Sequence, residues 1–497
     1  MKNKTIVIMG GGTAGWISAL YCLNKSKNLD LNLKVKLVSS NDIESIGVGE
    51  GTTRSFTNFI ENVCKIDRRE FLKETKGSFK YGIKFDNWNF DNNYYYHPFT
   101  CDSYYETRDE DLNYNFIQYA INNLNVPQKI LQKKLHGTLF DLLENNKVSL
   151  KINDGYSYHF SANLVVSFFM KKCLEFNEFE HIRGTIHKVN YEEDGSIKNI
   201  VIDENKTTEG DFYINCLGFN SKNVLSNEYF DNEYYDNYIL NNSAFAIQVK
   251  NSVSENLEPY TTSTAQEYGW TWKIPQYEKT GYGYVYSDSF TNDVDKLYED
   301  IIKTYGIEEK NVFKTKIVKS KPYYNRKQIH KNCLSIGLSS GFVEPLEATS
   351  INMSLVSLNL FFKMIENEIH FNQKSLEIFN DKMKKDWTNV FKFIIFHYFT
   401  NNPINEYWKY YKNIQQNNEF EFYEKELDTR IFSKFSYFVV GLGMNIEDYS
   451  YDFSQEKYFR ENVIDYFNIK TDLNTSQLYS LNEVLGEINK NSIGGNL

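Results

Sequence analysis

Cysteine is scarce in this chain, which has six among 497 residues. No two cysteines stand close enough to form a Cys-x-x-Cys pair, and their density is far below that of a disulfide-stabilised secreted domain. The scarcity therefore predicts reduced thiols and a cytoplasmic location.

Histidine motifs and long apolar runs are also missing. The eight histidines form no His-x-x-x-His or His-Glu-x-x-His pattern, so the sequence indicates no metal site. The apolar run in the N-terminal MKNKTIVIMGGG is too short for a signal peptide, and no stretch reaches the ~18 apolar residues of a membrane helix. We therefore expect a soluble protein that has no membrane partner.

Positive charge is in deficit. The chain has 55 Lys and Arg against 65 Asp and Glu, which gives a formal net charge of −10. An acidic chain repels the phosphate backbone of nucleic acids. This balance argues against nucleic acid as a partner.

The N-terminus carries the clearest local pattern. Residues 5–9 (TIVIM) predict a short buried strand, GGGTAGW follows at 10–16, and an apolar-periodic helix continues through Leu23. Residues 33–39 (LKVKLVS) predict the second strand. This strand–turn–helix–strand order is typical of the first unit of a nucleotide-binding α/β fold.

Gly10, Gly12 and Gly15 form Gly-x-Gly-x-x-Gly inside that unit. The first glycine permits a tight turn, the second lets the backbone approach a pyrophosphate, and the third lets helix and strand pack closely. The pattern predicts a dinucleotide site. Ser39 holds the position where an acidic residue usually binds the ribose, and no second Gly-x-Gly-x-x-Gly occurs, so we expect one dinucleotide site.

The rest of the chain predicts a single α/β (α+β) body with a mostly helical C-terminal part. Expected strands lie at 79–88, 182–191, 197–203, 211–218 and several times within 243–290, and a loop is expected at 91–115. Expected helices lie at 52–63, 68–75, 161–176, 293–305 and 351–362, with a mixed, mostly helical stretch at 111–145.

Residues 267–277 (EYGWTWKIPQY) place Trp270 and Trp272 on one side of an expected strand. Such alternation by itself indicates a strand that packs into the core. Lys80 and Lys84 are expected on one face of the strand at 79–88, where lysines usually meet solvent.

The stretch EPLEATSINMSL (344–355) predicts a helix start. Thr349 and Ser350 suit the first helical positions, where free backbone N–H groups attract anions. Glu347 lies just before them, where a carboxylate interacts favourably with the helix dipole, and alone it indicates only a structural role.

GLSSG at 337–341 matches the Gly-x-Ser-x-Gly elbow of hydrolases, and Asp381 and His397 follow in a workable order. The elbow requires a helix directly after the serine, whereas Gly341 and Pro345 intervene here. We therefore do not favour a hydrolase.

Together these motifs resemble the flavin-dependent halogenases of the tryptophan-halogenase type. The resemblance rests on stretches that keep the family's order along nearly the whole chain: GGGTAGW (10–16), IGVGEGT (46–52), GSFKYGIKFDNW (77–88), YYHPF (95–99), GWTWKIP (269–275), SIGLSSGFVEPLEATSI (335–351) and GLGM (441–444). The Trp-x-Trp-x-Ile-Pro box combined with the N-terminal glycine motif distinguishes this family from related flavin hydroxylases.

The resemblance implies that the dinucleotide is FAD. It implies the following flavin contacts: Gly10, Gly11, Gly12, Thr13, Ala14, Gly15, Ser39, Gly49, Leu338 and Ile351. It further implies a first FAD-binding segment at 1–95, a mostly helical segment at 96–154 that contributes to the substrate pocket, a second FAD-binding segment with sheets at 155–370, and a helical segment at 371–497 that covers the substrate.

The resemblance also implies the chemistry. Reduced FAD, O₂ and a halide held by the N–H groups of Thr349 and Ser350 would give hypohalous acid. The acid would pass to the catalytic lysine, Lys80, to be hydrogen-bonded or held as a haloamine, alternatives between which the sequence does not choose. Glu347 would be the catalytic glutamate, which stabilises the cationic arene and helps to remove its ring proton.

The remaining implied roles concern the two ring systems. His97 and Phe99 would flank an aromatic substrate, and Trp270 and Trp272 would separate it from the flavin, so that halide rather than the arene is oxidised. Because no second nucleotide motif occurs, reduced FAD is expected from a separate flavin reductase.

Departures from the family pattern concern the substrate and the halide. The chain has EATS where members that take tryptophan commonly have ESTG, so Ala348 lacks a hydroxyl and the Cβ of Ser350 narrows the halide pocket. Ile431 stands near the position of a stacking tryptophan. We therefore expect another indole, a phenol or a small heteroarene as readily as free tryptophan.

A flavin-dependent aromatic monooxygenase and a non-catalytic FAD-binding protein stay as alternatives. The monooxygenase explains the glycine motif but leaves Lys80, Glu347 and the tryptophan box without a role. The sequence does not reveal the oligomeric state, and a homo-oligomer stays open.

Overall fold

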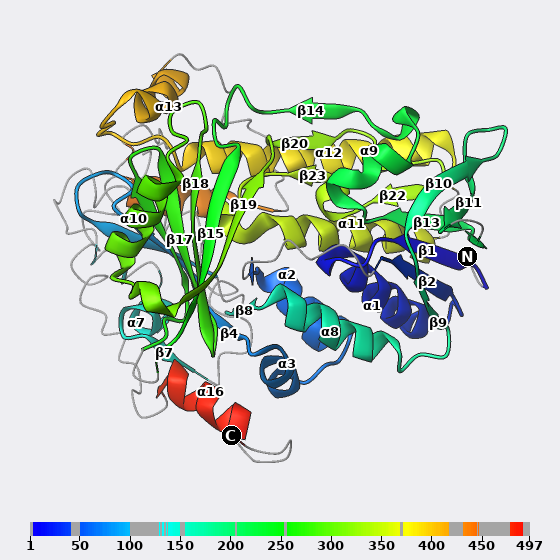
Figure 1. The fold of residues 1–497 in the computed structure, drawn as a ribbon, viewed down its shortest axis with the longest axis horizontal. Coiled ribbons are helices and arrows are strands. Elements are labelled where there is room, and N and C mark those ends of the chain that lie inside the picture. Colours follow the sequence, from blue (N-terminus) through cyan, green and yellow to red (C-terminus); the bar gives the residue numbers. More distant parts are fainter. Residues whose placement is uncertain are drawn as a thin grey trace, which may run out of the picture.

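The computed structural model describes residues 3–40, 50–99, 138–149, 155–203, 206–252, 256–367, 371–416, 431–444 and 478–490, with residues 129, 132, 133, 136 and 446 described singly. Within these residues it is a mixed α/β protein built on two large sheets (Figure 1). The predicted fold class is confirmed.

The first sheet is the expected nucleotide-binding core. Its order is β21–β22–β13–β1–β2–β9, and all neighbours are parallel except the short pair β21 and β22. The strands are β1 (Thr5–Met9), β2 (Lys34–Ser39), β9 (Phe179–Arg183), β13 (Phe212–Asn215), β21 (Ile329–His330) and β22 (Cys333–Ser335). The strand–turn–helix–strand unit predicted at the N-terminus is confirmed.

The second sheet has seven strands in the order β19–β15–β18–β17–β16–β5–β6 and is antiparallel except between β16 and β5. Its strands are β5 (Gly82–Asp86), β6 (Tyr94–Pro98), β15 (Ser243–Lys250), β16 (Thr261–Gln266), β17 (Gly269–Pro275), β18 (Lys279–Tyr286) and β19 (Val312–Lys319). The several strands predicted within 243–290 are therefore present.

Four small sheets complete the strand inventory of the described residues. They comprise β3 (Glu50–Gly51), β8 (Ser157–Phe160) and β4 (Ser78–Lys80); β10 (Ile186–Tyr191), β11 (Ile197–Ile202) and β12 (Lys206–Glu209); β14 (Asn232–Tyr234), β20 (Tyr323–Asn325) and β23 (Gly341–Phe342); and β24 (Tyr479–Ser480) with β7 (Lys147–Val148).

The helices of the described residues are α1 (Thr13–Asn28), α2 (Arg54–Thr57) continued by a π-helical turn (Asn58–Val63), α3 (Arg68–Thr75), α7 (Thr138–Glu144), α8 (Ala162–Cys173), α9 (Ser221–Val224), α10 (Val294–Tyr305), α11 (Thr349–Glu366), α12 (Gln373–Phe396), α13 (Glu406–Gln416), α14 (Lys434–Gly443) and α16 (Leu481–Lys490). Helix α1 packs on α8, and α11 packs on both α1 and α12. In Figure 1, α11 and α12 run alongside one another from the seven-stranded sheet toward the parallel sheet.

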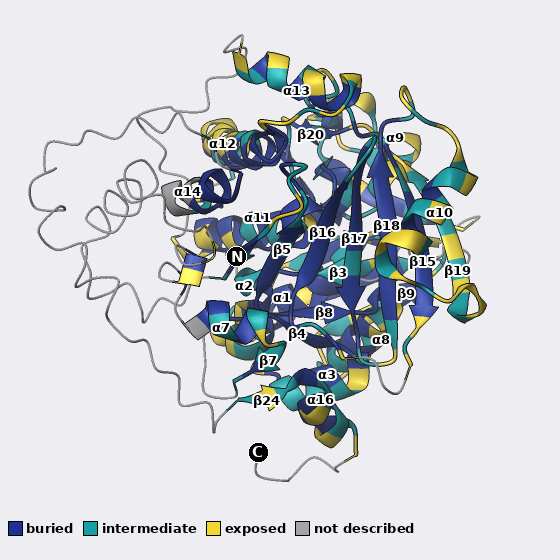
Figure 2. Cartoon of the chain, turned by 90° about the vertical axis from the view of Figure 1, so that its left-hand side faces the viewer, coloured by how far each residue is buried: buried dark blue, intermediate teal, exposed yellow. Residues whose placement is uncertain are grey.

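The main hydrophobic core is continuous from α1 and β1 through the aromatic side chains of α11 and α12 to the inner face of the seven-stranded sheet. A smaller core lies under β10–β12, and another fills the space between α10 and the seven-stranded sheet. Figure 2 shows the central strands and the inner helices in the colour of buried residues.

Helix α11, with the turn before it (Leu346–Glu366), has the length and mean hydropathy, 1.2, of a membrane span, although 67% of that window is buried inside the protein. The interior of this fold accounts for its apolar character, because α11 packs against α1 and α12.

The prediction of one continuous strand at 79–88 is wrong, and the difference matters for function. The strand is broken at Tyr81, whose N–H donates to the carbonyl of Pro259 at 2.7 Å and whose carbonyl accepts from Phe99 N at 2.8 Å. The halves, β4 and β5, join different sheets, so Lys80 and Lys84 do not share a strand face. Lys80 is 1% exposed, whereas the side chain of Lys84 is 23% exposed.

Two further expectations differ from the structure. Residues 94–98, expected in a loop, form β6, because their Tyr-rich side chains pair with β5 despite the Asn and Asp residues before them. The strand expected at 182–191 is divided at Gly184 into β9 and β10, which belong to different sheets. The four-segment domain division stays a prediction.

Candidate active site

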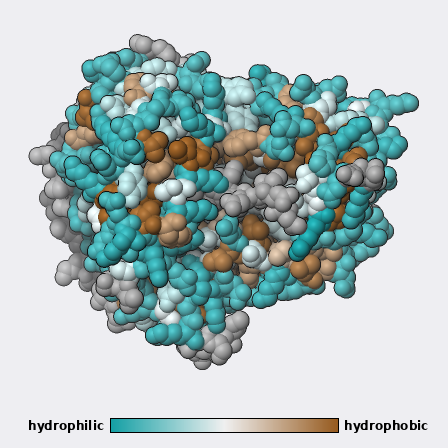
Figure 3. Space-filling view, viewed as in Figure 1, coloured by the Kyte–Doolittle hydropathy of each residue, from teal (hydrophilic) through white to brown (hydrophobic). Residues whose placement is uncertain are grey.

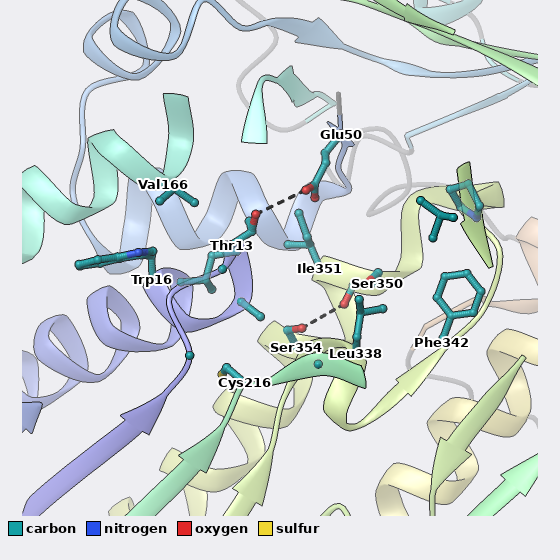
Figure 4. A pocket seen from close by; sticks show the side chains of 18 of the residues that line it. Thr13, Trp16, Glu50, Val166, Cys216, Leu338, Phe342, Ser350, Ile351 and Ser354 are labelled. Atoms are coloured by element: carbon teal, nitrogen blue, oxygen red, sulfur yellow. Dashed lines mark hydrogen bonds between the residues drawn. The ribbon is translucent and has the colours of Figure 1, made fainter. Parts of the chain in front are cut away.

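A cavity of about 700 Å³ lies where the two large sheets approach each other. Its lining comes from the carboxyl ends of β1 and β2, the first turn of α1, strands β15 to β17, and the segment that leads into α11. Figure 3 shows hydrophobic residues among the polar ones on this face, and Figure 4 shows part of the cavity lining from close by. The ends of parallel strands are where α/β sheets commonly bind nucleotides.

The glycine turn between β1 and α1 forms one wall of this cavity. Gly10 has φ +114°, and a Cβ there would lie 2.5 Å from the carbonyl oxygen of Cys216. A Cβ at Gly15 would lie 1.9 Å from the carbonyl oxygen of Gly10, whereas a Cβ at Gly12 would meet nothing within 4 Å. The turn is therefore tight where the chain packs on itself and open at Gly12, where a ligand's pyrophosphate would approach the backbone.

The first turn of α1 points toward the same space. Gly12 is the N-cap, and no side chain caps the free N–H groups that follow. Gly11, Thr13 and Ala14 also line the cavity, and Thr13 Oγ1 lies 3.5 Å from Glu50 Oε1 (Figure 4). Burial raises the pKa of Glu50 to about 7, against the weaker opposing effect of the contact with Thr13.

At the position where an acidic residue usually binds the ribose, this chain has Ser39, which is paired with His181. Ser39 Oγ lies 2.8 Å from His181 Nε2, and both residues line the cavity with Arg183. Hydroxyl and imidazole groups can bind ribose hydroxyls, although less strongly than a carboxylate. Gly49, expected near the flavin, lies outside the described residues.

These observations fit FAD. An uncapped helix N-terminus, an open glycine backbone and the Ser39–His181 pair lie along one cavity whose volume is in the usual range of ligand pockets. Leu338 and Ile351, also expected beside the flavin, line this cavity.

Lys80 reaches the same cavity from the end of β4. Burial lowers the pKa of its ammonium to about 8, although the negative charge of Glu347 acts to raise it. The Nζ atom lies 5.3 Å from the ring centroid of Phe99, and a Cβ at Gly51 would lie 3.3 Å from Nζ. Lys80 is therefore a buried amine that is partly neutral near pH 8.

Glu347 faces this cavity from the other side of the fold and is 5% exposed. Its Oε1 is 2.8 Å from His97 Nδ1 and 3.1 Å from His397 Nε2. Burial acts to raise the pKa of Glu347, but the two histidines outweigh this effect and lower the pKa to about 2. The carboxylate is therefore ionised.

The backbone around Glu347 is unusual. Glu347 has φ 64° and Ala348 has φ 55°, so two consecutive non-glycine residues are left-handed. This turn leaves Ala348 as an N-cap without a side-chain hydrogen bond, directly before Thr349 and Ser350. Ser350 lines the cavity, and the hydroxyl of Thr349 is buried without a hydrogen-bond partner among the described residues.

The two tryptophans of β17 also line the cavity. Trp270 is 1% exposed and donates from Nε1 to Glu344 Oε1 at 3.2 Å. Trp272 lies opposite Gly283 of β18, where a Cβ would meet the indole at 2.2 Å. Glycine at 283 therefore provides the space that the Trp272 ring occupies.

His97 and Phe99, predicted to flank the substrate, contact the two residues predicted to be catalytic, although neither lines the cavity described above. His97 contacts Glu347, and Phe99 lies beside Lys80. These side chains and the two proposed catalytic residues form one cluster, although they come from widely separated parts of the chain.

The hydrolase alternative does not agree with the structure. Ser339 is buried, and its hydroxyl contacts Gly218 N at 2.8 Å, Ser221 Oγ at 2.9 Å and Asn215 Oδ1 at 3.3 Å. His397 contacts Glu347 and Phe393 instead. Among the described residues, no histidine contacts Ser339, and its hydroxyl instead joins the loops around it by hydrogen bonds.

The sequence assigned no role in this site to three polar residues. Glu50 and Glu344 lie within the family motifs at 46–52 and 335–351, and these motifs are the signal that could have indicated them. His397 was considered only for the hydrolase alternative, and its contact with Glu347 from the C-cap of α12 has no signal in the sequence.

Comparisons with known proteins identify the family of this chain. The tryptophan halogenase family model matches residues 5–456. A tryptophan 6-halogenase from Streptomyces albogriseolus is 28% identical over 434 residues, which cover 83% of this chain and 80% of that protein. A tryptophan 7-halogenase from Lentzea aerocolonigenes is 28% identical over 442 residues, with coverage of 83% and 80%.

Solved structures show the same fold. A tryptophan C-6 flavin-dependent halogenase from taromycin biosynthesis has a TM-score of 0.82 at 24% identity, covering 98% of this chain and 100% of that one. A flavin-dependent halogenase from Brevundimonas sp. BAL3 also has a TM-score of 0.82, at 21% identity and with coverage of 98% and 99%. The chain belongs to the tryptophan halogenase family of flavin-dependent enzymes, which halogenate aromatic rings.

Proposed function

We propose that this chain halogenates an electron-rich aromatic substrate by passing the halogen from hypohalous acid to Lys80 and then to the ring, with Glu347 as the second catalytic group. The observation that carries the proposal is the shared cavity of Lys80 and Glu347, which are 1% and 5% exposed. A buried amine and a buried carboxylate in one pocket are costly to stability, and such groups are concentrated at catalytic sites.

The residues that would hold FAD are those of the glycine turn, the first turn of α1, Ser39 with His181, Leu338 and Ile351. When bound there, reduced FAD supplies the electrons that, with O₂ and halide, yield hypohalous acid. Because the sequence contains one Gly-x-Gly-x-x-Gly motif, we propose that a separate flavin reductase delivers the reduced FAD.

The halide would bind at the start of α11. The N–H groups of Thr349 and Ser350 have no side-chain cap, and the positive end of a helix dipole favours an anion. The hydroxyl of Thr349, which has no hydrogen-bond partner among the described residues, adds a further donor for the halide. Ala348 adds no hydroxyl, so backbone groups supply most of the contact.

Lys80 can act in either of two ways. As an ammonium it donates a hydrogen bond that polarises hypohalous acid, and as an amine it attacks the halogen to give a haloamine and water. Because burial and Glu347 set the pKa of Lys80 at about 8, both forms are present near that pH. The geometry is compatible with both alternatives.

Glu347 would act when the ring has taken the halogen. The arene then carries a positive charge, which the ionised carboxylate stabilises, and the ring carbon must lose its proton for aromaticity to return. A carboxylate with a pKa of about 2 is a weak base, but a protonated arene is a much stronger acid, so the transfer is favourable.

Trp270 and Trp272 would keep substrate and flavin apart. Their indole rings lie in the cavity wall, and Gly283 and Glu344 hold them there. On this proposal, hypohalous acid reaches an arene kept away from the flavin by way of Lys80, which lines the same cavity. The departures at Ala348 and Ile431 lead us to propose an indole, a phenol or a small heteroarene, with free tryptophan as one member of the set.

The test is product analysis with the purified chain. Reduced FAD, O₂, bromide and a panel of indoles, phenols and tryptophan would be incubated and examined by mass spectrometry. We expect a brominated arene from the wild-type chain, none from Lys80→Ala, and unchanged bromination from the matched control Lys84→Ala. FAD binding would be measured for each variant by flavin fluorescence.

Hydroxylation without bromination would favour a flavin monooxygenase. Binding of FAD without any turnover would favour a non-catalytic flavoprotein. Bromination that survives Lys80→Ala would remove this lysine from the mechanism.

A further inference from the structure

Beside Lys80, one face of a small sheet carries polar side chains to which the reaction described above gives no role. In the sheet of β3, β8 and β4, Gly51 pairs with His159, and His159 pairs with Ser78. Successive side chains of a strand point to opposite faces, so Ser78 and Lys80 share the face on which His159 lies. Ser78 and His159 are both 0% exposed, so their polar atoms depend on partners inside the protein.

His159 stands in the middle of a directed chain of hydrogen bonds. Its Nδ1 lies 3.3 Å from Ser78 Oγ, which donates to the carbonyl oxygen of Pro275 at 2.5 Å. A hydroxyl has one proton, and that of Ser78 goes to a carbonyl, so Ser78 accepts from Nδ1–H. Burial, and then the charge of Lys80, lower the pKa of His159 well below its usual value, so the ring is neutral and Nε2 accepts.

Thr261 completes this chain at the cavity. It lies on β16 of the seven-stranded sheet, and its Oγ1 is 2.8 Å from His159 Nε2. Because Nε2 accepts, Thr261 donates its only proton to the ring, and its oxygen has lone pairs alone to offer any other partner. Thr261 also lines the cavity. A small molecule beside Thr261 can therefore bind to this hydroxyl only by donating a hydrogen bond.

Lys80 borders the same space. A Cβ at Gly51 would stand 3.2 Å from Thr261 Oγ1 and 3.3 Å from Lys80 Nζ, and all three residues line the cavity. In the described part of the chain, no hydrogen bond joins Nζ to Oγ1 directly. A side chain at residue 51 would touch both groups, so glycine keeps the space between the amine and the acceptor oxygen open.

We propose that Thr261 binds hypohalous acid next to Lys80, accepting the O–H of the acid on its hydroxyl oxygen and so turning the halogen toward Nζ. His159 and Ser78 are positioning residues, which fix the direction of the Thr261 hydroxyl. This inference rests on the proposed function and adds a binding residue to it.

The contact with Thr261 serves both forms of Lys80. When Lys80 is an amine, its lone pair forms the nitrogen–halogen bond while the oxygen–halogen bond breaks with its electron pair on oxygen. The hydroxide then takes a proton from the same nitrogen and leaves as water. When Lys80 is an ammonium, it donates to the oxygen of the acid instead. In either case Thr261 keeps its own proton, which stays bonded to His159.

The direction of the chain also distinguishes the acid from the halide. A halide ion has no proton, and the lone pairs of an acceptor oxygen repel its charge, whereas hypohalous acid has an O–H group to donate. The start of α11 has the opposite character, because free N–H groups there favour an anion. The Thr261 end of the cavity therefore suits the oxidised halogen and excludes the halide.

The test is Thr261→Val, which removes the acceptor at nearly constant size. Brominated indole would be measured with reduced FAD, O₂ and bromide, and hypobromous acid would be captured by a scavenger in parallel reactions without indole. We expect captured acid within about twofold of wild type and brominated product per captured acid about tenfold lower or less. Thr261→Ser, which restores the hydroxyl, should return to within about twofold of wild type.

Thr262→Val is the matched control. Thr262 follows Thr261 on β16, both residues are 9% exposed, and Thr262 does not line the cavity. Its product per captured acid should equal that of wild type. Flavin fluorescence would measure FAD binding of every variant, so that a variant that does not fold is recognised.

Gly51→Ala tests the same space without removing a polar group. Its methyl group would stand against both Thr261 Oγ1 and Lys80 Nζ, so it should lower product per captured acid by about tenfold as well. This variant decides the matter if Thr261→Val does not fold. Wild-type product per captured acid in whichever of the two folds would overturn the inference, as would an equal loss in Thr262→Val or no recovery in Thr261→Ser.

A second readout does not need activity. Nitrogen-15 NMR of the FAD-free chain labelled at histidine should show His159, identified by the signal missing from His159→Gln, as a neutral ring with its proton on Nδ1. The Nε2 signal should move in Thr261→Val and stay in Thr262→Val. A proton on Nε2 would reverse the chain and overturn the inference even if the protein halogenates. A wild-type protein that makes neither hypobromous acid nor brominated indole but shows the expected His159 signals would overturn the proposed function.

Discussion

Replacing Lys80 by methionine should make the protein more stable while it removes activity. The ammonium of Lys80 is 1% exposed, and its pKa falls from the usual 10.5 to about 8, mainly through burial. At about 1.36 kcal/mol per pKa unit, that difference corresponds to about 3 kcal/mol of stability lost by holding the charge inside the fold. Methionine has a similar shape without a charge, so Lys80→Met should recover most of this amount at pH 7.

The stability gained in Lys80→Met should decrease as pH rises. A lysine whose folded pKa is lowered costs stability in full below pH 8, and the cost disappears as pH rises from about 8 to the unfolded value of 10.5. The advantage of Lys80→Met should therefore be about 3 kcal/mol at pH 7 and should vanish by about pH 10.5.

Urea unfolding of the FAD-free protein at several pH values measures this difference. Lys84→Met is the control, because Lys84 is on β5 with its side chain 23% exposed, and we expect a change within about 0.5 kcal/mol. A variant that is no more stable than wild type at pH 7, or an advantage that stays constant up to pH 10.5, would refute the reasoning about the buried charge.

Other substitutions test the remaining parts of the site. Glu347→Gln should keep halide oxidation, measured with a scavenger, but slow arene bromination by about 10²-fold or more, and an equal rate would reject its role. Gly283→Ala should displace the Trp272 ring, because its Cβ would lie 2.2 Å from the indole. We expect about 1–3 kcal/mol lower stability and less brominated product per reduced FAD. The control Gly486→Ala lies in a helix and its Cβ would meet nothing within 4 Å, so it should lower neither the stability nor the product yield. Glu344→Gln should lower stability by about 1–3 kcal/mol and also reduce product per reduced FAD, because an amide cannot accept from all three donors of the buried carboxylate; an unchanged product yield would mean that its hydrogen bonds do not hold the wall.

Local pattern was sufficient for the nucleotide-binding unit. Strand β1, the glycine turn and helix α1 are neighbours in sequence, so periodicity and turn chemistry define them without long-range information. The helix at α11 was equally clear, because its buried residues recur at helical spacing.

The division of residues 79–88 into two strands depends on tertiary pairing and could not be predicted from the sequence. The chain of 79–88 alternates like one strand, yet Tyr81 exchanges backbone hydrogen bonds with Pro259 and Phe99, so β4 and β5 part into different sheets. This break explains why Lys80 is buried and Lys84 is not. No alternation pattern within the segment contains that information, because the partners lie outside it.

The residues of the catalytic cluster were likewise only partly predictable from the sequence. Lys80 and Glu347 came from a family resemblance, and the structure brings both to one cavity. The sequence offered His397 only as a hydrolase histidine, because its contact with Glu347 spans 50 residues and depends on how the end of α12 is placed. The proton state of a buried group is likewise a property of its neighbours and not of its own segment.

The left-handed turn at Glu347 and Ala348 has a consequence for engineering the pocket. Each left-handed non-glycine residue costs about 1–2 kcal/mol, and only a side chain without branching at Cβ tolerates that conformation well. A mutant library at Ala348 should therefore recover mainly glycine, asparagine and serine and reject valine and isoleucine, whatever their fit to a halide. The left-handed backbone at Ala348 therefore limits which residues are tolerated there, whatever they would contribute to halide binding. To accommodate a larger halide, the side chain at Ser350 should be changed instead.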